Sequence, residues 1–302
     1  MDNNLQGWIN LYKPKNISSF KAINKIKSIL NLHKIGHAGT LDPLAEGILP
    51  IALGKTTKLI PYLINKNKKY KFTIKWGEQT TTDDSEGELL YKSDIVPDYE
   101  KISLVLNKFT GSFLQIPPKA SAIKINGERA YKLFRDNKQF EMKAKKVFVK
   151  KIKIISHNHE TTSFEIECGK GFYIRSLGRD LAIELGTYGH IYSLERLKVG
   201  KFTKESSILL DDLIKIGERH SKINCIHTSI SMLDDILAFE IDNNDDIKNL
   251  SLGKSINIDE NKLRKFSSEV FDKKQVFISN NGDIVSIGKL IGNLFKPKKV
   301  LI

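Results

Sequence analysis

A strict alternation of side chains over residues 70–76 constrains the fold most. Every second residue is aromatic or aliphatic, and lysine or threonine lies between: Tyr70, Phe72, Ile74 and Trp76 against Lys71, Thr73 and Lys75. Successive side chains of a strand point to opposite faces, so the pattern predicts a strand with one face in the core. Residues 18–32 differ, because their apolar residues recur every three or four positions, which predicts a helix capped by Ser18 or Ser19. The chain therefore mixes helices and strands.

Two further segments carry weaker signals. Residues 147–155 predict another strand, and residues 163–175 predict a strand pair or a bent strand broken at Gly169-Lys170-Gly171. Ser176 is then expected to cap a helix that runs through Leu185 and stops at Gly186. In that reading Tyr173 and Arg175 share one face of a strand.

A small β-rich unit is expected to follow from about residue 236. Short apolar stretches at 276–278 and 284–287 flank an Asn-Asn-Gly turn at 280–282, which is typical of a hairpin. We therefore expect two domains, residues 1–235 and residues 236–302.

The charge of the chain is distributed unevenly. Residues 1–200 hold 33 basic and 20 acidic residues, whereas residues 201–302 hold 16 and 15. A compositional bias spread evenly along the chain does not concentrate the excess of basic residues in residues 1–200. This distribution therefore indicates a polyanionic partner for residues 1–200, most commonly nucleic acid.

Composition excludes several classes of protein. The two cysteines, Cys168 and Cys225, are too few for a disulfide framework or a cysteine-rich zinc site. No run approaches 18 apolar residues, which excludes a membrane span, and residues 1–6 lack the pattern of a secretory signal. We expect a soluble cytoplasmic protein.

The segment from Gly36 to Thr57 is rich in motif-like residues, but two familiar readings fail. Gly54-Lys55-Thr56 ends like a P-loop, yet Leu49 occupies the position of the required first glycine. His33 and His37 are spaced like zinc ligands on a helix, yet Lys34 stands where the metalloprotease pattern needs glutamate.

Asp42 remains as the chemically active candidate. It stands between Gly39 and Pro43, and Asp-Pro is also a favourable start of a helix, with the aspartate as cap. The alternative is an anionic carboxylate that a loop presents as nucleophile or base. Spacing alone favours the cap.

The Gly-Thr-Leu-Asp-Pro centre of this segment closely resembles the signature of the TruB family of bacterial tRNA pseudouridine-55 synthases. Further matching motifs occur in the same order along residues 7–200: Gly7-Trp8-Ile9, Lys13-Pro14, Lys69-Tyr70, residues 117–124, residues 127–131, Gly171 to Leu177 and Leu194 to Leu197. Asn16 replaces the usual glycine, and asparagine also tolerates a positive φ.

The resemblance implies an α+β, mixed-sheet catalytic domain followed by a small PUA-like β-barrel. It also implies that a uridine in the TΨC loop of tRNA, flipped from its stack, is isomerised to pseudouridine without cofactor or metal. Asp42 is then the catalytic carboxylate and Arg175 its charge-assisted partner, although Glu165 or Glu167 is an alternative partner for that arginine. The remaining carried-over positions are His37, Tyr70, Tyr173 and Leu194 around the uridine, and Lys13, Lys124 and Arg129 at the RNA backbone.

A rival class stays open at this point. A non-catalytic RNA-binding protein shares the basic surface and the salt-sensitive binding of tRNA but lacks the chemistry. Nothing in the sequence indicates an obligate oligomer, so we expect a monomer that binds the T-stem-loop and has no membrane partner.

Overall fold

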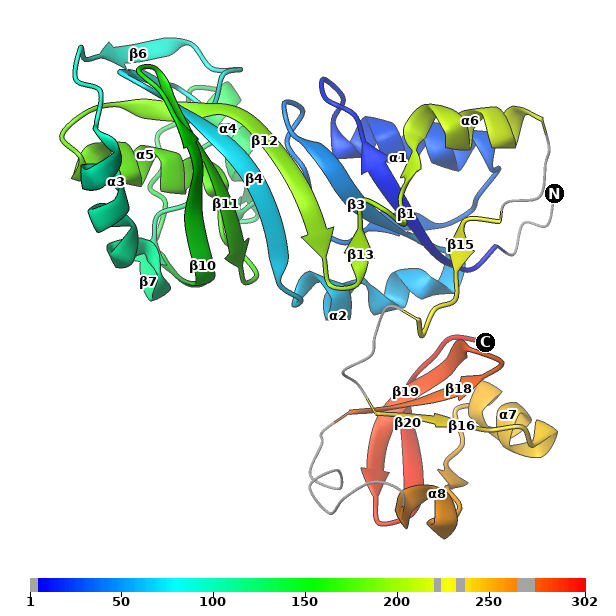
Figure 1. Ribbon diagram of the computed structural model, residues 1–302. Coiled ribbons are helices and arrows are strands. Elements are labelled where there is room, and N and C mark those ends of the chain that lie inside the picture. Colours follow the sequence, from blue (N-terminus) through cyan, green and yellow to red (C-terminus); the bar gives the residue numbers. More distant parts are fainter. Residues whose placement is uncertain (1–4, 220–223, 232–236, 265–274) are drawn as a thin grey trace.

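The computed structural model describes residues 5–219, 224–231, 237–264 and 275–302. The large sheet of this chain is mixed (Figure 1), and its strands follow the order β14-β1-β3-β12-β4-β11-β10-β7. Their bounds are β14 Ile208–Leu209, β1 Gly7–Lys13, β3 Glu46–Leu53, β12 Gly189–Val199, β4 Lys68–Trp76, β11 Thr161–Cys168, β10 Lys145–His157 and β7 Gly111–Gln115. Three short strands pair at its margins: β2 Ile35–His37 on β3, β13 Phe202–Thr203 on β12, and β15 Ile226–His227 on β1. Most neighbours are antiparallel, but β12 runs parallel to β3.

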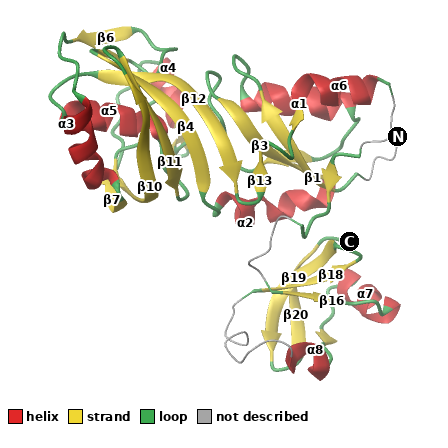
Figure 2. Ribbon diagram, viewed as in Figure 1, coloured by secondary structure: helices red, strands yellow, loops and turns green. Residues whose placement is uncertain are grey.

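Helices accompany the large sheet (Figure 2). They are α1 Ser19–Ile29, α2 Ile60–Ile64, α3 Tyr99–Val105, α4 Ala130–Arg135, α5 Ile174–Glu184 and α6 Leu210–Glu218, with 3₁₀ turns η1 Gly54–Leu59 and η2 Leu106–Phe109. Of the apolar stripe predicted from spacing, Ile23, Ile26 and Leu30 are buried in the main core, but Phe20 is 70% exposed, so its place in the stripe was predicted wrongly. Ser18 caps this helix by accepting a hydrogen bond from the Lys21 amide at 3.2 Å. Two two-stranded hairpins, β5 Glu78–Thr80 with β6 Leu89–Lys92 and β8 Lys124–Ile125 with β9 Glu128–Arg129, project from the sheet.

The predicted strands at 70–76 and 147–155 are confirmed within β4 and β10. The alternation of β4 places Phe72 in the core, where its ring stacks on Phe164 with the centroids 5.1 Å apart. Asn16 adopts a φ of 62°, as expected for the residue that replaces a glycine.

The predicted strand over residues 163–175 is wrong beyond Cys168. Gly171 turns the chain with a φ of 73°, and α5 begins at Ile174 rather than after Ser176. Leu177 and Leu181 are buried in the main core, and this helical spacing outweighs the strand-like run of Phe172 and Tyr173. Arg175 therefore lies in the first turn of a helix, and the prediction that Tyr173 and Arg175 share one face of a strand is wrong.

The last part of the chain forms a five-stranded sheet in the order β16-β18-β19-β20-β17. Its elements are β16 Ala238–Glu240, α7 Asn244–Ser251, β17 Ile256–Asn257, α8 Glu260–Arg264, β18 Val276–Asn280, β19 Asp283–Ile291 and β20 Leu294–Val300. The predicted Asn-Asn-Gly hairpin is confirmed, since Asn281 and Gly282, with φ of 50° and 77°, join β18 to β19. This curled sheet agrees with the expected PUA-like unit. The expected boundary between residues 235 and 236 lies outside the described residues.

An apolar cluster joins the two parts of the molecule. It combines Trp8, Leu63 and Phe202 from the first part with Phe277 and Leu301 from the second. The indole nitrogen of Trp8 also donates to the Ser229 carbonyl at 3.2 Å. The second part thus packs beneath α2 and β1 on a shared core (Figure 1).

Candidate active site

Asp42 lies in the loop between β2 and β3, and no helix begins there. Its carbonyl accepts only a turn hydrogen bond from the Ala45 amide at 3.1 Å, and its side chain is 31% exposed. The carboxylate is therefore not used as a helix cap. It faces solvent on one side and a buried guanidinium on the other.

Arg175 holds that carboxylate with two donors. Its Nε lies 2.9 Å from Oδ2 of Asp42, and its Nη2 lies 3.0 Å from Oδ1. Such a fork orients both oxygens of the carboxylate. The alternative partners Glu165 and Glu167 pair with lysines instead, so the predicted pairing of Arg175 with Asp42 is confirmed.

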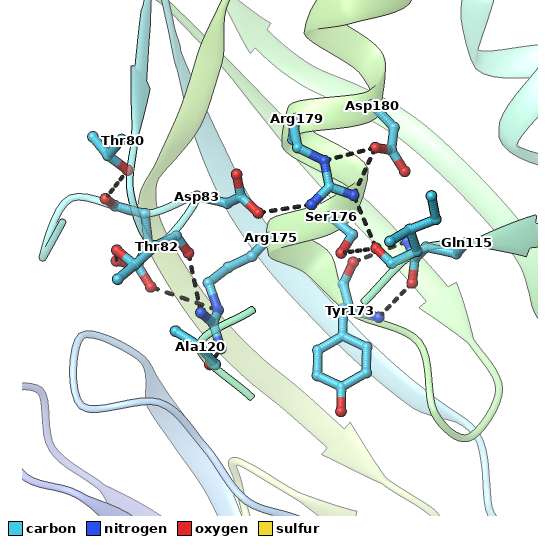
Figure 3. Close-up of polar contacts among 12 residues, drawn as sticks. Thr80, Thr82, Asp83, Gln115, Ala120, Tyr173, Arg175, Ser176, Arg179 and Asp180 are labelled. Atoms are coloured by element: carbon cyan, nitrogen blue, oxygen red, sulfur yellow. Dashed lines mark hydrogen bonds and ion pairs between the residues drawn. The ribbon is translucent and has the colours of Figure 1, made fainter. Parts of the chain in front are cut away.

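The guanidinium of Arg175 is itself fixed, being only 5% exposed. It donates to the carbonyls of Thr82 and Ala120, each at 3.0 Å, and Figure 3 shows both contacts. These two carbonyls come from different loops. Arg175 therefore joins helix α5, the 82–87 loop and the segment before β8 around Asp42.

A second carboxylate, Asp84, faces the same guanidinium, with Oδ2 3.5 Å from Nε of Arg175. It is almost fully buried, accepts from the Thr82 hydroxyl at 2.5 Å and from the Glu86 amide at 3.1 Å, and burial raises its pKa. Asp84 is not among the site residues predicted from the sequence. The available signal was two successive acids shortly after a strand, since β5 ends at Thr80.

Arg179 repeats this arrangement one turn further along α5. Its Nη1 contacts Oδ2 of Asp83 at 2.9 Å, and it also pairs with Asp180, as Figure 3 shows. Residues four apart lie on one face of a helix, so Arg175 and Arg179 together hold the acidic loop against α5.

Two of the candidates are partly buried tyrosines. Burial is the largest cause that raises the pKa of Tyr70 and of Tyr173, and the charge of Asp42 adds a smaller increase to each. The backbone of Tyr173 is fixed by Gln115, which accepts from its amide at 2.9 Å and donates to its carbonyl at 3.1 Å (Figure 3). Leu194 is 5% exposed, and its partner across the strands is Phe72, two residues from Tyr70.

His37 ends β2 with its Nδ1 buried and without a hydrogen-bond partner in the described structure. Burial and the nearby Arg196 lower the pKa of this imidazole, so the ring is neutral at pH 7. A neutral ring with an unused nitrogen is suited to contact a base.

The three residues predicted to contact the RNA backbone separate into two groups. Lys124 and Arg129 are exposed neighbours across the β8–β9 hairpin. Lys13 is not available to RNA: its side chain is fully buried, and its ammonium donates to the carbonyls of Pro14 at 2.8 Å and Ile17 at 2.7 Å. Burial lowers its pKa to about 8. Sequence does not distinguish this interior lysine from a surface one.

Within the described ranges, no group of three or more His, Cys, Asp or Glu side chains lies close enough together to hold a metal ion. Nor is any helix there both long and apolar enough to cross a membrane.

Comparison with known proteins identifies similar chains. Residues 27–174 match the model of the TruB family pseudouridylate synthase (N terminal domain). The chain is 39% identical to tRNA pseudouridine synthase B of Ehrlichia ruminantium over 98% of this chain and 99% of that protein. It is 40% identical to tRNA pseudouridine synthase B of Rhizobium meliloti over 98% and 95%.

Solved structures share the fold. A Cbf5-Nop10-Gar1 complex contains a chain that matches with a TM-score of 0.70 at 24% identity, covering 98% of this chain and 85% of that one. An H/ACA RNP bound to a substrate RNA containing 2'-deoxyuridine matches with a TM-score of 0.70 at 22% identity, over 98% and 85%. At these identities the likeness extends to the fold alone.

Proposed function

The chain belongs to the TruB family of pseudouridylate synthases, and we propose that it isomerises uridine 55 in the T-loop of tRNA, with Asp42 as catalytic carboxylate. The observation that supports this role is the Asp42 carboxylate, 31% exposed and held by the two donors of Arg175. No other carboxylate of the site combines this exposure with this orientation among the described residues, since Asp83 and Asp84 are buried.

The reaction exchanges one glycosidic bond for another. The bond between C1′ of the ribose and N1 of the uracil breaks, the base rotates, and a bond from C1′ to C5 forms. The C5 hydrogen leaves as a proton, and N1 takes up a proton. Redox change and group transfer are both absent, so the step needs no co-substrate. Three routes are open: attack of the carboxylate on C1′, its addition to the base, or abstraction of a proton from the sugar. Each of them needs an anionic oxygen within bonding reach of the nucleotide.

The substrate base has to leave its stack to reach Asp42. Tyr70 and Tyr173 lie within electrostatic reach of the carboxylate, and we assign them to contacts with the flipped uracil, where stacking contributes about 1–3 kcal/mol per base. We assign Leu194 to the apolar side of the uracil pocket. The neutral ring of His37 is assigned to the gap that the flipped base leaves in the RNA stack.

The T-stem-loop is the proposed partner, with Lys124 and Arg129 at its phosphates. Both side chains are exposed on a hairpin next to Ala120, whose carbonyl contacts Arg175. We further propose that the enzyme works as a monomer in the cytoplasm.

The Asp42→Asn variant tests the assignment. Asparagine keeps the shape and removes the charge, so release of tritium from tRNA that carries 5-tritiated uridine is expected to fall below detection, while tRNA binding stays within about threefold. Asp98→Asn is a matched control, because Asp98 is an exposed helix cap and asparagine caps equally well. Tritium release at the wild-type rate by Asp42→Asn refutes the role, and no release by the wild-type protein favours the rival reading of a non-catalytic RNA-binding protein.

A further inference from the structure

The backbone on either side of Asp42 is held by hydrogen bonds from the segment around helix α1. The residue before it, Leu41, is held through both of its polar backbone groups by one hydroxyl. Ser19 donates to the Leu41 carbonyl at 2.8 Å, and the same oxygen accepts from the Leu41 amide at 2.8 Å. Ser19 is 2% exposed, so solvent does not replace these bonds.

This double contact limits where the catalytic side chain can point. The Leu41 carbonyl belongs to the peptide plane that also contains the Asp42 nitrogen, and peptide planes are rigid. Fixing that carbonyl therefore fixes one of the two planes that meet at the Asp42 Cα. Its Cα–Cβ bond can then change direction only by rotation about φ.

Other contacts extend the support to the rest of the loop. Arg196, which is 1% exposed, donates to the carbonyls of Gly39 at 2.9 Å and Ile48 at 2.6 Å. After Asp42, the Pro43 carbonyl accepts from the Asn16 amide at 2.8 Å. Of the two side chains, Ser19 and Arg196, only Ser19 contacts the residue directly before Asp42.

The preceding serine, Ser18, makes a different contact. Ser18 caps helix α1 through the Lys21 amide, whereas Ser19, one residue later, faces the loop instead. The Ser18 hydroxyl therefore stabilises helix α1, and the Ser19 hydroxyl holds the loop that carries Asp42. Substituting each serine in turn distinguishes the stability of α1 from the alignment of Asp42.

We propose that Ser19 is a positioning residue for the isomerisation, which holds Leu41 so that the Asp42 carboxylate meets both Arg175 and the flipped nucleotide. The inference rests on the proposed role of Asp42. Misplacement of a reacting group by about 1 Å costs on the order of a hundredfold in rate, so a loosened loop is expected to show in the chemical step.

The test compares Ser19→Ala with Ser18→Ala. Single-turnover tritium release is measured with saturating enzyme, alongside the Kd for tRNA and the Tm. Ser19→Ala is expected to slow release about ten- to hundredfold with the Kd within threefold of wild type. Ser18→Ala, which loses the helix cap, is expected to lower the Tm as well and to keep the rate within twofold.

Equal rates for the two variants, or a wild-type rate in Ser19→Ala, overturn the proposal. If Ser19→Ala does not fold, Ser19→Cys replaces the hydroxyl with a weaker hydrogen-bonding group of similar shape, and the same criteria apply. The Asp42→Asn experiment separates the two inferences: if that variant is inactive and Ser19→Ala is not slowed, only the positioning role fails.

Discussion

Replacement of Arg175 by lysine tests how much of the activity depends on the shape of the guanidinium rather than on its charge. Arginine makes four hydrogen bonds here, two to the Asp42 carboxylate and one each to the carbonyls of Thr82 and Ala120. A lysine ammonium is a point charge without the fork, and it contacts Asp42 through one bond at most.

The expected loss follows from that count. At least one hydrogen bond to a charged group disappears, and such bonds contribute about 1.5–3 kcal/mol each. If the lost energy holds Asp42 in its reactive orientation, the rate falls about 10- to 150-fold, at about 1.4 kcal/mol per tenfold. Arg175→Met also leaves Asp84 without its compensating cation and is expected to lower the stability by about 3–5 kcal/mol.

Single-turnover tritium release from 5-tritiated tRNA measures the rate, and filter binding measures the Kd. Arg135→Lys is the control, because the side chain of Arg135 is 74% exposed and its ion pair with Asp136 is long, at 3.9 Å. A folded Arg175→Lys protein that works within threefold of wild type refutes the reasoning, because the fork is then irrelevant to the chemistry.

Two further predictions concern stability. The pKa of Lys13 is about 8 in the folded chain and near 10.5 in the unfolded one, so the unfolded state binds more protons between these values and the stability contributed by this site rises with pH. Between pH 7 and pH 10, wild type is expected to gain about 2 kcal/mol in free energy of unfolding relative to Lys13→Met, and equal changes in urea titrations contradict this. Trp8→Ala removes a fully buried side chain from the shared core and is expected to cost about 3–5 kcal/mol by the same titrations, with less than 1 kcal/mol counting against that role.

Local patterns predicted those elements whose signal lies within a few residues. The alternation of residues 70–76 and the cap at Ser18 each depend on neighbours along the chain, and both are confirmed. Asn16 likewise needs only its own backbone preference. The start of α5 was predicted wrongly because Tyr173, at its N-cap, provides no side-chain hydrogen bond, so the usual sequence signal is missing.

The site depended on contacts far apart in the chain, which periodicity does not report. Family resemblance supplied the pairing of Arg175 with Asp42, 133 positions away. Neither spacing nor resemblance distinguished buried Lys13 from an exposed lysine, or gave Asp84 a place beside Arg175. These properties arise only when the sheet brings β1, the 82–87 loop and α5 together.

The apolar cluster that unites the two parts of the molecule has a thermodynamic consequence for any large ligand. Since Trp8 and Phe277 share one interior, the freedom of the parts to swing against each other is lost during folding. A polynucleotide that touches both then encounters a rigid template, and its affinity is not diminished by the entropy of docking one part onto the other.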